Sequence, residues 1–135
     1  IFSAFIDMIE MAKKGQLVKI GKGDKKTNPI YEGDLAQITV DAINKQNSVI
    51  EAGGKTIYTR KELNEIVQKG IDNQKSIKTI PLGLFKMALP ILKMFSKNMY
   101  DKFAFFITVM QHDTIAPQIG NMTFEDYIKM KVNEK

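Results

Sequence analysis

The sequence predicts one helix-rich α/β domain that spans residues 1–135. Two observations indicate this fold class. Apolar residues recur at helical spacing over most of the chain, whereas segments with strand character are few and short. The length, with 44% hydrophobic and 26% charged residues, is typical of one globular domain. Because the strands are too few for a complete sheet, we expect residues 1–135 on their own to be of the α+β kind, with several helices and a few short strands.

Glycine residues divide the N-terminal part into elements. Apolar residues at helical spacing predict a helix over residues 2–14, and Gly15 is placed to end it. A short strand is expected over residues 17–20. The glycine-rich and charged segment 21–26 is then expected to form an exposed turn.

Capping residues mark three further helix starts. Asp34 is placed to cap a helix that ends near residue 44, and we favour this structural role over contact with a substrate hydroxyl. Thr59, with Glu62 three residues later, has the capping-box pattern. Thr123 is the expected cap of the last helix.

A pair of glycines marks a turn in the middle of the chain. Residues 48–52 are expected to form a strand that this pair closes. Gly53 and Gly54 are predicted to adopt positive φ angles there, in a structural role. A phosphate site would need a helix that starts directly behind them, and none is expected.

The C-terminal half is expected to be mostly helical. A strand over residues 77–80 precedes an apolar helix that begins at Pro81, and Pro90 is expected to kink or break that helix. Lysines on one side permit two interpretations: a core or interface helix with a solvated stripe, or an element that lies on a membrane surface. These lysines are Lys86, Lys93 and Lys97.

Composition and charge exclude several kinds of site. The sequence has no cysteine, so it has no disulfide and no thiolate metal site, and a cytoplasmic location is expected. His112 is the single histidine, without a cysteine or a second histidine to form a catalytic or metal-binding set, and we interpret it as a helix-end residue rather than as a substrate contact. The net charge of +5 comes from scattered basic residues, without the basic and aromatic stripe that nucleic-acid binding needs. We therefore expect no metal and no nucleic-acid partner.

An ordered series of motifs runs from the first strand to the Thr59 helix start. It comprises a glycine-bounded strand, an Asn-Pro-Ile segment, a Gly-Asp-Leu-Ala segment, a Gly-Gly pair and a Thr-x-x-Glu-Leu segment. In this order the series resembles atypical and extended short-chain dehydrogenase/reductases, among them NAD(P)-binding proteins similar to nucleoside-diphosphate-sugar epimerases. The residues that carry the resemblance are 19–23, 28–30, 33–36, 51–54 and 58–63.

The resemblance implies that residues 1–135 are the C-terminal, substrate-side part of a Rossmann-type protein. The glycine-rich turn that holds NAD or NADP, and a Tyr-x-x-x-Lys catalytic pair, are then expected in an absent N-terminal Rossmann half. An abrupt start at Ile1 fits such a fragment. We expect no catalytic or cofactor-binding residue in this chain and no activity from it alone. The helix over residues 2–14 would place its apolar face on the missing half, and an exposed apolar face could form a homo-oligomer.

Asn28 is the candidate substrate-binding residue. The resemblance places it beside the substrate pocket, and a carboxamide both donates and accepts hydrogen bonds, which suits a nucleotide or a sugar. An Asn before a Pro is also an ordinary turn residue, so both roles remain open at this point.

Two functions of different classes follow for the parent protein. The first is an NAD(P)-dependent oxidoreductase or nucleotide-sugar epimerase-like protein, in which this part shapes the pocket for a small-molecule substrate. The alternative is a non-catalytic NAD(P)H-sensing or scaffold protein whose C-terminal helices dock a partner or a membrane surface. An independent small domain that only looks like the family is a third interpretation.

Overall fold

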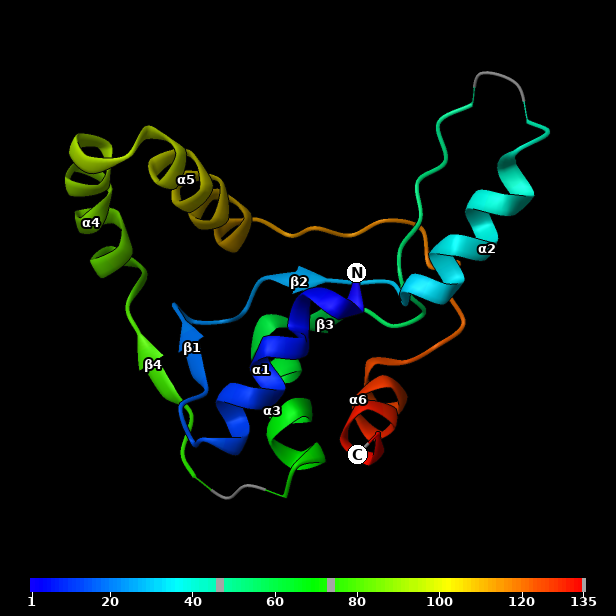
Figure 1. Cartoon of the computed structure of the whole chain (residues 1–135), viewed down its shortest axis with the longest axis horizontal. Helices are drawn as coiled ribbons and strands as arrows, with labels where there is room; N and C mark the ends of the chain where they lie inside the picture. Colours follow the sequence, from blue (N-terminus) through cyan, green and yellow to red (C-terminus); the bar gives the residue numbers. More distant parts are fainter. Residues whose placement is uncertain (46–47, 73–74, 135) are drawn as a thin grey trace.

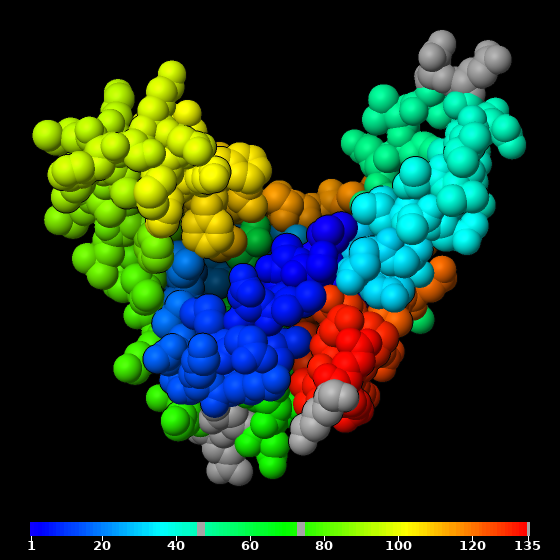
Figure 2. All heavy atoms as spheres, viewed as in Figure 1, coloured from blue at the N-terminus to red at the C-terminus, as the bar shows by residue number. Residues whose placement is uncertain are grey.

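The computed structural model, which describes residues 1–45, 48–72 and 75–134, has a central body with two arms (Figure 1). Helices α1, α3 and α6 form the body, whereas α4 and α5 form one arm and α2 with the segment after it forms the other (Figures 1 and 2). The helices are η1 (Phe2–Phe5), α1 (Ile6–Lys13), α2 (Glu32–Ala42), α3 (Arg60–Gly70), α4 (Leu82–Phe95), α5 (Lys97–Gln111) and α6 (Phe124–Asn133). The strands are β1 (Val18–Ile20), β2 (Lys26–Thr27), β3 (Tyr58–Thr59) and β4 (Lys78–Ile80).

Two short strand pairs join segments that are far apart in the sequence. β1 pairs with β4 in parallel, and β2 pairs with β3 in the antiparallel sense. The prediction of a helix-rich α/β fold with a few short strands is therefore confirmed. Because β1 and β4 run in the same direction, their carboxyl ends meet at one edge, where the Gly21 N–H donates to the Ile80 carbonyl at 2.9 Å.

The core lies between α1, α3 and α6, and it includes the apolar face of the first helix. Phe2 is only 1% exposed, and its ring centroid lies 5.3 Å from that of Phe124 and 5.1 Å from that of Tyr127. Ile9 and Ala12 belong to the same buried cluster. The expectation that this face would lie on a missing half is therefore wrong for these residues: α3 and α6 of the same chain bury it.

The predicted helix caps at Thr59 and Thr123 are confirmed, but the one at Asp34 is wrong. Thr59 forms both halves of a capping box with Glu62, and Thr123 accepts a bond from the backbone N–H of Asp126. Helix α2 instead begins at Glu32, without a side-chain cap. The Asp34 carboxylate accepts hydrogen bonds from two backbone N–H groups of the segment before α6, at 2.7 and 3.0 Å, which is a tertiary contact that local spacing does not reveal.

The predictions for residues 48–52 and for the two glycines after them are corrected by the structure. No strand forms over residues 48–52, and neither Gly53 nor Gly54 has a positive φ angle. Instead, each glycine lets a neighbouring segment of the chain come closer than a Cβ atom would allow. A Cβ on Gly53 would meet the Asn28 side chain, and one on Gly54 would meet the Pro29 carbonyl oxygen.

The strand at residues 78–80 and the helix that follows it agree with the predictions in outline. Pro81 is the residue before α4, as expected for a proline at a helix start. The expected break at Pro90 does not occur, since α4 continues through that residue to Phe95. The loss of one backbone hydrogen bond at a proline is thus accommodated inside this helix.

Tyr58 connects the β3 strand to α6 through its hydroxyl group. The hydroxyl donates to Glu125 Oε2 at 2.6 Å and accepts from the Phe124 N–H at 3.0 Å, and the residue is only 4% exposed. Burial, followed by the hydrogen bond to Glu125, raises the pKa of Tyr58 to about 12 from 10.0. The neutral hydroxyl is therefore the form that the fold favours.

Tyr58→Phe is expected to lower the free energy of unfolding by about 1–3 kcal/mol, because it leaves a buried N–H without its acceptor. The stabilisation is present below pH 10 and is lost as the pH rises towards 12, since the pKa of Tyr58 is higher in the folded chain than in the unfolded chain. Urea unfolding measured across this pH range checks both statements. Tyr100→Phe is the control, and an equal loss of stability from both substitutions would contradict the assignment.

Candidate functional site

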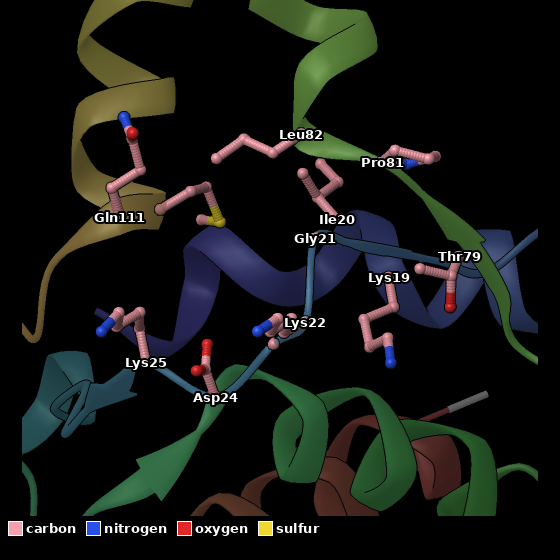
Figure 3. A pocket seen from close by; sticks show the side chains of 12 residues that line it. Lys19, Ile20, Gly21, Lys22, Asp24, Lys25, Thr79, Pro81, Leu82 and Gln111 are labelled. Atoms are coloured by element: carbon pink, nitrogen blue, oxygen red, sulfur yellow. The ribbon is translucent and has the colours of Figure 1, made fainter.

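An open groove of about 740 Å³ lies at the carboxyl ends of β1 and β4 (Figure 3). One wall is apolar and is formed by Ile20, by Leu82 at the start of α4 and by Met110 near the end of α5. The opposite side is the charged loop after β1, whose Asp24 and Lys25 lie away from the apolar wall in Figure 3. Open parallel sheets bind their ligands at the carboxyl ends of the strands, so this groove is the strongest candidate site.

Two glycines shape the loop that forms the charged side of the groove. Gly21 and Gly23 have φ angles of +64° and +71°, which residues other than glycine rarely adopt. A Cβ on Gly23 would also lie 3.2 Å from the backbone nitrogen of Lys61, whose N–H donates to the Gly23 carbonyl at 2.9 Å. The loop is thus held closely against the start of α3.

The charge of the groove is positive. Lys19, Lys22 and Lys25 line it, and Asp24 is the one acidic residue among the lining residues that the structure describes. Positive charge along a concave surface attracts anions and raises their local concentration. The arrangement of a cationic loop opposite an apolar wall suits a ligand with an anionic group and an apolar or aromatic part.

Arg60 fixes the end of α5 over this groove. Its Nη2 group donates to the Val109 carbonyl at 2.7 Å and lies 3.4 Å from the His112 carbonyl. Burial lowers the pKa of Arg60, and nearby Asp113 opposes that shift. The Asp113 carboxylate in turn accepts from the Lys26 N–H at 2.8 Å. These bonds hold the Met110 side of the groove to α3 and β2.

Asn28 lies outside the groove and joins three segments. It is 5% exposed, and its Nδ2 donates to the carbonyls of Gly54 and Ala116 at 3.2 and 2.8 Å. Its Oδ1 accepts from the Ala116 N–H at 2.9 Å. Both amide hydrogens are therefore used within the fold. A second cavity of about 370 Å³ borders Asn28. Contact between Asn28 and substrate stays a prediction.

The remaining predicted residues also lie apart from the groove. His112 follows the last residue of α5, and its Nδ1 lies 2.8 Å from the Thr108 carbonyl oxygen, as a helix-end residue would. Among residues 1–45, 48–72 and 75–134, no group of three or more potential metal ligands occurs. The groove itself was missed by sequence reasoning, which interpreted residues 21–26 only as an exposed turn.

A Tyr-x-x-x-Lys spacing does occur once in the sequence, at Tyr127 and Lys131, contrary to the expectation that the chain has none. Tyr127 is 0% exposed, and its hydroxyl lies 3.3 Å from Glu32 Oε1. Burial, followed by the Glu32 carboxylate, raises the pKa of Tyr127 to about 12. A catalytic tyrosine that acts as a base needs a lowered pKa and access to substrate, so Tyr127 is a core residue here, and Lys131 instead pairs with Glu134 at 2.7 Å.

The structure offers no cradle for a dinucleotide of the Rossmann kind in the residues that it describes. Such a cradle needs a glycine turn between a strand and a helix, whose N-terminus faces the pyrophosphate. Here the turn at Gly21–Gly23 joins β1 to the strand β2, and Lys26 stands where a third glycine would be needed. The residues present therefore do not fit NAD or NADP at this turn.

Comparisons with known proteins leave the family open. No protein-family model matches the chain, and no curated protein matches it.

Proposed function

We propose that this chain is the substrate-side part of an NAD(P)-dependent oxidoreductase or nucleotide-sugar epimerase-like protein, and that the groove at β1 and β4 receives the substrate. The motif series that resembles short-chain dehydrogenase/reductases supports the family. The cofactor, NAD or NADP, and the catalytic pair belong in this proposal to an N-terminal Rossmann half. The chain alone then binds substrate but does not catalyse hydride transfer.

The single observation that carries the proposal is the position of the groove. It opens at the carboxyl edge of a parallel strand pair, which is where α/β proteins place their ligands. Its lysines suit the diphosphate of a nucleotide sugar, and its apolar wall suits the base. The glycine loop allows the backbone to come close to such a ligand.

UDP-glucose is expected to bind the chain, and Lys22→Glu combined with Lys25→Glu is expected to weaken that binding by about tenfold or more. A hydrogen bond to a charged group contributes about 1.5–3 kcal/mol, and tenfold corresponds to about 1.4 kcal/mol. Calorimetric titration at two salt concentrations measures both the affinity and its ionic part.

The matched control for this prediction reverses two lysines outside the groove, Lys45 and Lys129. This control has the same change in net charge as the groove variant, and it is expected to bind UDP-glucose as the unchanged chain does. Equal affinity of the groove variant and the unchanged chain would contradict the site. Tight, saturable binding of NADH by this chain would contradict the placement of the cofactor in another part.

A further inference from the structure

The outer face of α4 is apolar and lies open to solvent. Met94 and Phe95 are 85% and 84% exposed, and Met87 is 73% exposed. With Leu84 and Ile91 they lie within an arc of about 100° around the helix, given 3.6 residues per turn. A continuous apolar face of this kind marks a surface that another body covers.

The same region carries positive charge without any acidic residue. No aspartate or glutamate occurs between Asp72 and Asp101. Lys86 donates to Gln111 Oε1 at 2.8 Å, and Lys93 lies 5.7 Å from the centre of the Tyr100 ring, so both lie on the α5 side of α4. They are about 130–150° around the helix from the middle of the outer face. The lysines of this acid-free stretch are Lys75, Lys78, Lys86, Lys93 and Lys97.

Charge of a single sign favours one kind of occupant. Interfaces with proteins are depleted of lysine at their centre, and a protein surface that matches a purely basic region needs acids at defined positions. A membrane with anionic lipids offers a uniform negative surface above an apolar layer. On a helix that lies in the interface, lysines of the polar face stay at the level of the headgroups while the apolar residues of the other face enter the layer beneath.

We propose that the outer face of α4 docks on the surface of an anionic lipid membrane. Helix α4 has 14 residues and contains Lys86 and Lys93. No helix in the described part of the chain is long and apolar enough to cross a membrane. The helix therefore lies in the plane of the surface. Its arm stands away from the central body, which leaves the face accessible (Figures 1 and 2). This inference does not depend on the proposed substrate.

Vesicle flotation tests the proposal. The chain is expected to float with phosphatidylcholine vesicles that contain about one third phosphatidylglycerol, and to stay behind with pure phosphatidylcholine. Met94→Ser combined with Phe95→Ser should abolish flotation. Lys86→Glu combined with Lys93→Glu should weaken partitioning by about tenfold or more, since each lysine contributes about fivefold at an anionic surface.

The control replaces two exposed apolar residues on the other arm. Val40 and Ile43 are 58% and 75% exposed, and their double replacement with serine should leave flotation unchanged. Circular dichroism confirms that each variant keeps its helix content. Failure to bind anionic vesicles, or equal binding to neutral ones, would overturn the proposal. So would a dimer that depends on Met94 and Phe95, because a second copy would then cover the face.

Discussion

Replacing Phe2 with alanine is expected to lower the free energy of unfolding by about 3–5 kcal/mol, the usual cost of removing a buried aromatic ring. The Phe2 ring contacts those of Tyr31, Phe124 and Tyr127, and no part of α3 or α6 can move in to fill its place without breaking other contacts of the core. Urea unfolding followed by circular dichroism measures the change.

Phe95→Ala is the control for this large effect. Phe95 is 84% exposed, so its removal should change stability by no more than about 0.5 kcal/mol. If Phe2→Ala lowered the stability as little as Phe95→Ala does, the placement of Phe2 in the core between α1, α3 and α6 would be wrong. The first helix would then need another body to cover it, as the sequence resemblance implied.

Gly54→Val is the second substitution with a large expected effect, a loss of about 3 kcal/mol or more from overpacking. The Cβ would meet the carbonyl oxygen of Pro29, which is backbone and cannot rotate away. The Gly54 N–H also donates to the Asn28 carbonyl at 2.9 Å, so any shift of the backbone weakens the junction around Asn28.

Gly83→Ala provides a contrast at a glycine without neighbours. An added Cβ there meets nothing within 4 Å, and the residue lies inside α4. Alanine should therefore stabilise the chain by up to about 1 kcal/mol through helix propensity. Thermal unfolding of both variants gives the comparison. A Gly54 variant as stable as the unchanged chain would show that the backbone at Gly54 does not lie directly against the Pro29 carbonyl.

Local features of the fold could be predicted from the sequence because neighbouring residues determine them. The capping box at Thr59 needs only Glu62 three positions later, and Gly15 ends the first helix with a φ angle of +66°. The pairing of β1 with β4 is different. It joins residues 60 positions apart, as in Val18 with Lys78, and no local pattern specifies a partner at that distance.

Tertiary contacts also explain the wrong predictions. Asp34 looked like a helix cap, but two backbone N–H groups 87 and 88 positions away compete for its carboxylate. The glycine pair at 53 and 54 looked like a tight turn, but its lack of side chains serves contact with Asn28 and Pro29. A sequence shows that a residue is small or acidic, and the fold decides which neighbour makes use of it.

The candidate site was hidden for the same reason. Two of its three lysines, Lys22 and Lys25, fall in a loop that reads as an ordinary exposed turn. Most of its apolar wall comes from Leu82 and Met110, which belong to α4 and α5. The pattern that could have indicated it is Gly21-Lys22-Gly23 directly after a strand, taken as an anion-binding loop in its own right.

The proposed site is tested most directly by recording the amide NMR spectrum of this 15.3 kDa chain during a titration with UDP-glucose. Saturable shifts are expected for the backbone amides of residues 19–25, Thr79, Leu82, Met110 and Gln111, which line the groove. The amides around Asn28 and the core of α6 should stay unchanged. Shifts confined to the cavity beside Asn28, or no shifts at all, would contradict the groove as the place where substrate binds.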